Sequence, residues 1–268
     1  KATIEYWFYK NGDTVRSYNK VLIVPFEQNR YLCGIQKNFA ETSNKSHTEI
    51  VNYFRYGLIS EIQNEFLYHH RTLSLLHNAD SLKDLYKTYA SISYAFTPLP
   101  EPEEDNKKKN IKPKTEKTTK IEDGQVKSKR VIIPKYAKVV LVKPEILNYL
   151  NQKYGADVFL FVTELDIEND ISDPIAFINN EYIRFIKVHY CLIDNKGTYL
   201  NEGVVQVNFP NTLNDMYILK KEYFPVVAKL LAKELPPSTR KNSADKYWGF
   251  IIELKYSINI SYLCKSTV

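Results

Sequence analysis

An uninterrupted apolar run at residues 21–24, followed by a long amphipathic helix, most constrains the fold of this chain. Four consecutive apolar residues predict a strand that is covered on both faces, as in a sheet with helices packed against it. Ser46 and Glu49 have the spacing of a capping box, and apolar residues then recur at every fourth position. This pattern predicts a helix over residues 47–66. We therefore expect an α/β (α+β) fold, a mixed sheet with helices packed on it.

Local signals predict further elements on both sides of this pair. Residues 3–10 read as a strand, and Asn11-Gly12 after them predicts an N-terminal hairpin within residues 1–19. The other predicted elements are, in order, a strand near 72–76, a helix near 80–91, strands at 139–142 and 157–167 with a helix between Pro144 and Gly155, a hairpin of 181–193 with 198–208, and a helix in 218–235 that follows Pro225. We expect 21–24, 139–142 and 157–167 to be neighbouring strands of one sheet.

A charged segment separates the two apolar halves. Between residues 101 and 130 the chain has ten Lys or Arg and seven Asp or Glu, and few apolar side chains. Such a segment cannot bury enough surface to offset the entropy lost on ordering it. We therefore predict a charged flexible insertion at 100–130 within a single domain spanning 1–268. Deleting it is expected to preserve the fold, whereas cutting the chain at residue 115 is expected to give two poorly folded fragments.

The C-terminal extension, residues 236–268, has the most regular periodicity of the chain. Every even position from Trp248 to Tyr262 is aromatic or aliphatic, and most odd positions between them are polar or small. A period of two predicts one long strand with an apolar face. This strand can close over the core of its own sheet, another protein can complete its apolar face by strand addition, or it can belong to a membrane-facing sheet.

Motifs for the common catalytic and nucleotide-binding sites are absent from the sequence. The eight glycines form neither GxGxxG nor GxxxxGK[ST], and there is no GxSxG or HExxH. Cys33, Cys191 and Cys264 lie far apart with no CxxC, which favours buried or free thiols over a zinc or redox site. No apolar stretch approaches the length of about 20 residues that a membrane-spanning helix needs. We expect no catalytic residues, no cofactor and no metal.

Two groups of titratable residues nevertheless share a strand face and offer candidate sites. Glu164, Asp166 and Glu168 alternate on one strand face, where they can bind a divalent cation, act in acid–base catalysis, or form the solvated side of a sheet. The solvated side is the favoured interpretation. His189 and Cys191 also share a strand face, but a structural role is favoured over a catalytic pair. The other histidines considered lie at helix ends or near loops, and surface capping is expected for His47, His69 and His70.

The order of motifs resembles a family of bacterial envelope domains. A strand ending in Pro25-Phe26 precedes a long helix, Gly155-Ala156-Asp157 introduces a strand, and Tyr190-Cys-Leu-Ile-Asp194-Asn-Lys-Gly197 has the form of a hairpin turn. This order resembles the α/β domain of the amino-terminal part of the Tol translocation protein B, of the curli-secretion lipoprotein and of the outer-membrane lipoprotein activators of peptidoglycan synthases. The resemblance covers about residues 20–95 and 139–235. It implies a periplasmic, often lipid-anchored protein without catalytic residues, whose lipobox cysteine would precede Lys1.

The functional hypothesis is a non-enzymatic protein-binding subunit of a bacterial cell-envelope assembly, a lipoprotein on the periplasmic side of an outer membrane. Its expected partners are other envelope proteins, with no nucleic acid. The candidate contact residues are Trp7, Tyr31, Trp248 and Phe250, for which a core position is the alternative, and Lys107, Lys108 and Lys109. The competing hypothesis is a cytoplasmic or envelope protein that binds nucleic acid or another anionic surface through its basic 107–130 segment.

Overall fold

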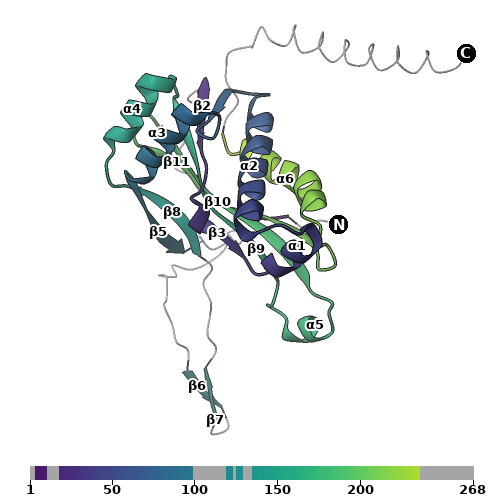
Figure 1. Ribbon diagram of the computed structural model, residues 1–268. Coiled ribbons are helices and arrows are strands. Elements are labelled where there is room, and N and C mark those ends of the chain that lie inside the picture. Colours follow the sequence, from purple (N-terminus) through teal and green to yellow (C-terminus); the bar gives the residue numbers. More distant parts are fainter. Residues whose placement is uncertain (1–3, 11–17, 99–118, 123–124, 129–134, 236–268) are drawn as a thin grey trace, which may run out of the picture.

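A computed structural model of the chain describes residues 4–10, 18–98, 119–122, 125–128 and 135–235 (Figure 1). The elements are, in chain order, β1 (Ile4–Lys10), β2 (Lys20–Val24), the 3-10 helix η1 (Gln28–Arg30), β3 (Tyr31–Cys33), α1 (Gln36–Ser43), α2 (His47–Phe66), β4 (Arg71–Ser74), α3 (Ala79–Tyr89), β5 (Ile92–Pro98), β6 (Thr119–Glu122), β7 (Gln125–Ser128), β8 (Lys135–Leu141), α4 (Glu145–Tyr154), β9 (Val158–Asn169), α5 (Pro174–Ile178), β10 (Ile183–Asp194), β11 (Tyr199–Pro210) and α6 (Met216–Ala232).

One mixed sheet of seven strands organises the fold. Its order is β1-β11-β10-β9-β2-β4, and β3 pairs with β9 beside this path. Strand β2 runs parallel to β9 and β4, whereas β9, β10, β11 and β1 are antiparallel neighbours. The same edge of β9 pairs with β2 along its first half and with β3 along its second. The α/β fold class is confirmed, and residues 21–24 and 157–167 are neighbours as expected.

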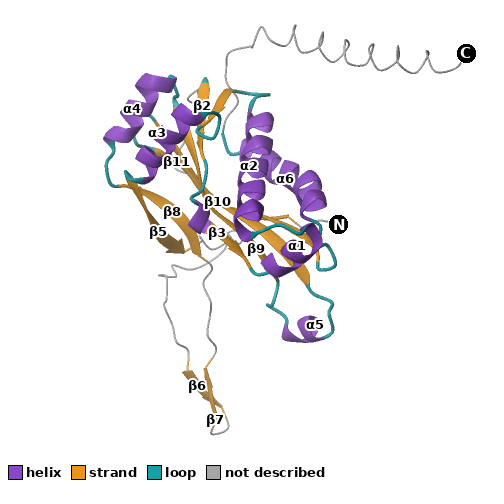
Figure 2. Cartoon of the chain, in the orientation of Figure 1, coloured by secondary structure: helices purple, strands orange, loops and turns teal. Residues whose placement is uncertain are grey.

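Helices cover both faces of this sheet (Figure 2). On one face, Ile23, Leu160 and Val188 share a buried cluster with Phe54 of α2 and Phe224 of α6. On the other face, sheet residues such as Phe159 and Cys191 share a second cluster with side chains of α3, α4 and β8. This double cover explains the apolar run at residues 21–24, because alternate side chains of β2 enter the two clusters.

The segments with the strongest local sequence signals form the predicted elements. Helix α2 spans His47–Phe66, and Ser46 and Glu49 form both hydrogen bonds of the capping box. Helix α4 ends at Gly155, whose left-handed φ of 64° suits glycine. Helix α6 begins at Met216 and runs through Pro225, so the prediction of a helix only after this proline was too short. No helix in the described part of the chain is long and apolar enough to cross a membrane.

The N-terminal hairpin does not form. Strand β1 pairs with β11, from Ile4 opposite Val207 to Lys10 opposite Asn201. Strand β2 has β9 on one side and β4 on the other, so neither of its edges is free for β1. The prediction from Asn11-Gly12 was wrong because long-range pairing at the open edge of β11 decides where β1 lies.

Strand β8 is not a member of the main sheet. It pairs with β5 in a separate two-stranded antiparallel sheet that packs over β9, β10 and β11. The prediction that residues 139–142 neighbour 21–24 was therefore wrong. The physical reason is that β2 and β9 already pair with each other, and β8 instead covers the apolar face above them.

The charged segment contains some secondary structure. Strands β6 and β7 form a short antiparallel ladder from Thr119 opposite Ser128 to Glu122 opposite Gln125, so the prediction that all of 100–130 lacks structure was wrong for these residues. Cross-strand pairing can order a short polar segment that has little apolar surface. The predicted strand from Trp248 to Tyr262 lies outside the described residues.

Deletion of residues 101–130 is expected to leave thermal stability nearly unchanged. Pro98 and Lys135 are partners at the end of the β5–β8 ladder, so the two ends of the insertion already meet. The expected change in melting temperature is within about 3 °C, which corresponds to about 1 kcal/mol in a protein of this size. Differential scanning calorimetry measures it. A loss of more than about 10 °C, on the order of several kcal/mol, would contradict this prediction.

Candidate functional site

A β-bulge in β9 places a group of polar side chains under β8. His189 is opposite Glu164 in the register of β10 with β9, but the next residue, Tyr190, is opposite Val162. Thr163 is therefore the extra residue of a bulge. Because of it, Glu164 lies on the face turned toward β8, although Val162 belongs to the cluster on the face covered by α2 and α6. Bulges often re-aim side chains in this way beside functional sites.

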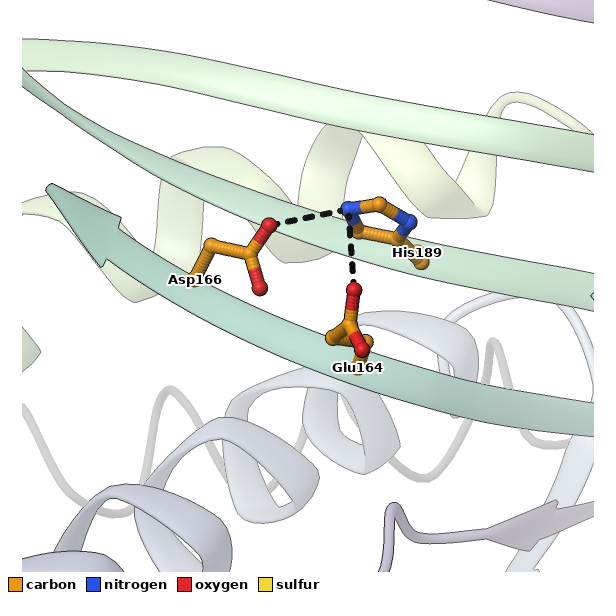
Figure 3. A group of neighbouring side chains, drawn as sticks. All are labelled: Glu164, Asp166 and His189. Atoms are coloured by element: carbon orange, nitrogen blue, oxygen red, sulfur yellow. Dashed lines mark hydrogen bonds and ion pairs between the residues drawn. The ribbon is translucent and has the colours of Figure 1, made fainter. Parts of the chain in front are cut away.

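The group consists of Glu164, Asp166 and His189 (Figure 3). His189 Nε2 is 3.1 Å from Asp166 Oδ2 and 3.9 Å from Glu164 Oε1. The Glu164 and His189 side chains are each only 4% exposed, and that of Asp166 is 14% exposed. Glu168, two residues further along β9, is exposed. The interpretation of the acidic row as a solvated face was thus wrong for Glu164, because β5 and β8 cover this end of the row.

Arg30 supplies the positive charge of the group. Its Nη2 is 2.7 Å from Glu164 Oε2, and its guanidinium lies 4.7 Å from the ring centre of Tyr94 and 5.2 Å from that of Phe96. Burial, together with the nearby Asp166 carboxylate, raises the pKa of Glu164, and His189 and Arg30 oppose this rise. The contacts of Arg30 tie η1 to both β5 and β9.

His189 and three other side chains complete the hydrogen bonding of the buried edge of β8. The N–H of Ala137 donates to His189 Nδ1 (2.9 Å) and the N–H of Val139 to Cys191 Sγ (3.4 Å). The carbonyl oxygens of the same two residues accept from Thr163 Oγ1 (2.7 Å) and Tyr199 OH (2.8 Å). Buried backbone groups need such partners. His189 and Cys191 therefore do share a face, and their common role there is to bind β8.

This arrangement fixes the tautomer of His189. A backbone N–H can only donate, so Nδ1 carries a lone pair and the proton of the neutral ring is on Nε2. Nε2–H then donates to Asp166 Oδ2. Both ring nitrogens are thus occupied, and His189 has no free lone pair with which to accept a proton from a substrate.

Binding of a divalent cation is the other role to test for Glu164, Asp166 and His189. One donor atom from each of Glu164, Asp166 and His189 lies within 4.8 Å of the others, and Asp166 Oδ1 has no hydrogen-bond donor among the described residues. A neutral imidazole that binds a metal through Nε2, however, carries its proton on Nδ1 and donates it. Here Nδ1 accepts from Ala137, and the Arg30 cation already pairs with Glu164. The residues therefore do not fit a metal.

Adding Zn²⁺ or Mn²⁺ to the purified protein is expected to leave its melting temperature unchanged. A metal that binds only the folded state would raise the melting temperature, because it adds about 2.7 kcal/mol of stability at a metal concentration of about 100 times Kd. The control is the His189→Ala variant, which should respond to the metal as the wild type does. A rise that the wild type shows and this variant lacks would contradict the prediction.

Other cysteines and histidines of the described residues were also predicted to have structural roles. Cys33 and Cys191 are free thiols, as expected, and burial raises the pKa of the Cys191 thiol to about 12, whereas Cys264 lies outside the described residues. His47 and His69 are exposed, but the prediction of surface capping was wrong for His70, which is buried. Its Nδ1 is 3.1 Å from the carbonyl oxygen of Tyr18. The chain folds back over the end of α2 there, which a helix-end signal in the sequence does not reveal.

The predicted contact residues do not form a surface site among the described residues. Tyr31 is buried and stacks on Phe54 with ring centres 6.0 Å apart, so its core alternative is confirmed. Trp7 lies in β1 opposite Val204, and only its backbone is described. The other candidates lie outside the described residues, namely Trp248, Phe250, Lys107, Lys108 and Lys109.

Sequence reasoning missed the segment that links β9 to β10, residues 170–183, which we call the protrusion. It extends beyond the sheet and carries α5 (Figure 1). Five large apolar side chains are exposed on it: Ile171, Ile175, Phe177, Ile178 and Ile183. The only sequence signal was Asp173-Pro174, a helix start followed by apolar residues. The helix is too short for a period to identify which side chains face the solvent.

Comparisons with known proteins do not identify a family. No family model and no curated protein matches the chain. Among solved structures, the chain is similar to a dodecamer of a PelC point variant from Paraburkholderia phytofirmans, with 9% identity over 89% of this chain and 98% of that one, at a TM-score of 0.34. At these values the likeness establishes neither a shared fold nor a shared function.

Proposed function

We propose that this chain is a non-enzymatic, protein-binding subunit of a bacterial cell-envelope assembly. The observation that carries the proposal is the apolar surface of the protrusion, where Ile171, Ile175 and Ile178 are 66%, 71% and 81% exposed. Burying such a side chain is worth about 1.5–3 kcal/mol. Exposed apolar groups concentrated on one segment are typical of a surface that another molecule covers.

The internal hydrogen bonds of the protrusion support a binding role. Asp173 Oδ1 accepts from the N–H groups of Ile175 (2.8 Å) and Ala176 (3.2 Å) and so caps α5. Asn211 Nδ2 donates to the carbonyl oxygen of Asn180 (2.8 Å), which links the protrusion to the chain after β11. A segment held in one conformation before it binds loses less entropy on binding.

The buried polar group supports the non-enzymatic part of the proposal. The two ring nitrogens of His189 bond to β8 and to Asp166, and Glu164 pairs with Arg30. These side chains therefore hold strands together. The burial of Glu164 and His189 also keeps a substrate away from these two side chains.

The envelope location follows from the resemblance of the motif order to envelope lipoproteins. Cell fractionation of the full-length gene product tests it. Recovery with the outer membrane, together with incorporation of a radiolabelled fatty acid, is the expected result. Recovery in the cytosol would reject the envelope location and leave the protein-binding role standing.

A double variant of the protrusion, Ile175→Ser with Ile178→Ser, tests the binding role. We expect it to lose the proteins that cross-link to the wild type in intact cells, because both side chains are exposed and their loss removes no core packing. The matched control is Leu67→Ser with Tyr68→Ser, two exposed apolar residues at the end of α2. Equal cross-linking by the protrusion variant and the wild type would reject the proposal.

Binding of a polyanion through residues 107–130 is a second candidate, which the charge of this segment favours. It contains ten Lys or Arg and three Asp or Glu, and each phosphate that such a segment neutralises adds a salt-dependent increment to the affinity. Titration with heparin at increasing salt tests this function. Steeply salt-dependent binding that deletion of 101–130 abolishes is the expected result for a polyanion-binding protein.

A further inference from the structure

A groove between α2 and α6 offers a second exposed surface. It has a volume of about 650 Å³ and is lined by residues of α2 and by Lys220 of α6, together with Lys45 just before α2. We call it the α2–α6 groove. Gly57 shapes it, because a Cβ atom there would lie 2.9 Å from Lys220 Cε. The missing side chain lets Lys220 lie across α2.

The walls of the α2–α6 groove are aromatic and basic. Tyr53 and Tyr56 line it, and Lys220 Nζ lies 5.4 Å from the ring centre of Tyr53. The one carboxylate of the lining, Glu49, accepts from both the N–H and the hydroxyl of Ser46 in the capping box, and its Oε1 lies 3.9 Å from Lys45 Nζ. Lys220 forms no ion pair with a described residue. The groove therefore presents two aromatic rings next to the ammonium group of Lys220.

The protrusion has the complementary composition. Residues 170–183 include Asp170, Asp173 and Glu181 but no Lys or Arg. The next residue, Arg184, is buried and donates to Asn169 Oδ1 and to the carbonyl oxygen of Leu213. Exposed isoleucines flanked by acids match a groove of aromatic rings flanked by lysines, both in polarity and in charge.

We infer that the protrusion of one copy of this chain binds in the α2–α6 groove of a second copy. This inference rests on the proposed protein-binding function and names its partner. The isoleucines of α5 lie against Tyr53 and Tyr56, and the acids of the protrusion lie near Lys220. Each copy has one protrusion and one groove, so the contact is head-to-tail. Repetition of such a contact produces a closed ring or an open chain of copies.

Sedimentation of the full chain over the micromolar range measures this association. The wild type is expected to form species larger than dimers, and high salt should weaken them because acids and lysines meet across the contact. The protrusion variant Ile178→Asp and the groove variant Tyr56→Asp should each weaken association by at least about 30-fold, the effect of losing one hot-spot residue. Leu67→Asp, an exposed position away from both surfaces, is the matched control.

A mixture of the two variants gives the sharpest test. Ile178→Asp retains an intact groove and Tyr56→Asp retains an intact protrusion, so together they should form a one-to-one complex that grows no further. Charge reversal gives an independent readout: Lys220→Glu should weaken association, and adding Glu181→Lys to the partner copy should restore it. Circular dichroism melts of every variant confirm that each is folded.

Three results would overturn the inference. The first is a wild type that stays monomeric over the whole concentration range, the second is a mixture of folded variants that forms no complex, and the third is a protrusion variant that associates as strongly as the wild type. If the protrusion variant still loses cross-linked envelope proteins in any of these cases, the proposed function stands and only the second copy as partner is rejected. If the protrusion variant keeps both the cross-linked proteins and self-association, both proposals fail.

Discussion

Replacing Arg30 by alanine is expected to lower the free energy of unfolding by roughly 3–5 kcal/mol, the cost of removing one partner of a buried ion pair. Arg30 Nη2 lies 2.7 Å from Glu164 Oε2, and the Glu164 side chain is only 4% exposed. Without the guanidinium, this carboxylate remains buried next to Asp166, with no cation beside it. Urea unfolding at neutral pH measures the loss.

The pH dependence of this loss separates charge from packing. Burial already raises the folded-state pKa of Glu164, and removing Arg30 raises it further. A carboxyl group whose pKa is higher in the folded state destabilises the protein fully above that pKa, and the effect disappears below the unfolded-state pKa. The difference between Arg30→Ala and the wild type should therefore shrink as the pH falls toward about 4, near the ordinary pKa of a glutamate.

Two results would contradict the charge argument. If Arg30→Ala costs the same at neutral and acidic pH, its contribution comes from packing on Tyr94 and Phe96. In a double-mutant cycle, Arg30→Ala should also cost much less in a Glu164→Gln background, because no buried charge is then left alone. An equal cost in both backgrounds would show that the two residues are not coupled.

Replacing Asp84 by alanine is expected to lower the free energy of unfolding by roughly 3 kcal/mol, because this buried carboxylate accepts several hydrogen bonds. A hydrogen bond from a charged donor contributes about 1.5–3 kcal/mol. Asp84 lies in α3, and its donors all lie in α4: Tyr149 OH at 2.8 Å, Lys153 Nζ at 2.6 Å, and Tyr154 OH. Together they hold α4 against α3. Thermal or urea unfolding measures the loss.

The contribution of Asp84 to stability should change with pH in the opposite sense to the contribution of Glu164, because the ionised form of Asp84 stabilises the folded protein. Burial alone would raise the pKa of Asp84, but hydrogen bonds from Lys153, Tyr154 and Tyr149 lower it below its ordinary value. The stabilisation is therefore fully present above the unfolded-state pKa and is lost as the pH falls through the folded-state value. The control is Asp80→Ala in the same helix, whose exposed pair with Lys83 should contribute less than about 1 kcal/mol. Equal losses in the two variants would contradict the role of Asp84.

The elements that were predicted correctly have their signals within one segment. The capping box and the four-residue spacing are both in the sequence of α2, and Gly155 marks the end of α4 by its own backbone preference. The turn between β10 and β11 is likewise local: the N–H groups of Lys196 and Thr198 donate to the side chain of Asp194. Such signals depend on residues a few positions apart, so the sequence alone contains them.

The candidate site could be predicted only in part. Period-two alternation placed Glu164 and Asp166 on one face of their strand, and it placed His189 and Cys191 together on one face of theirs. The structure confirms both pairs. It could not reveal that β8 covers these residues or that Arg30 approaches from η1. Those contacts join segments separated by 26 to 134 positions along the chain, from Ala137 with Thr163 to Arg30 with Glu164.

The sequence by itself determined the elements that have a local signal, such as α2, α4 and the turn between β10 and β11, because hydrophobic period, caps and turns act over a few residues. Only the tertiary structure decided the partner of β1, the separate sheet of β8, the burial of Glu164 and the exposure of the isoleucines in the protrusion. These outcomes depend on which strand edges and apolar faces remain uncovered once the rest of the chain has folded. Burial and edge pairing are properties of the whole assembly of elements, and a single segment does not encode them.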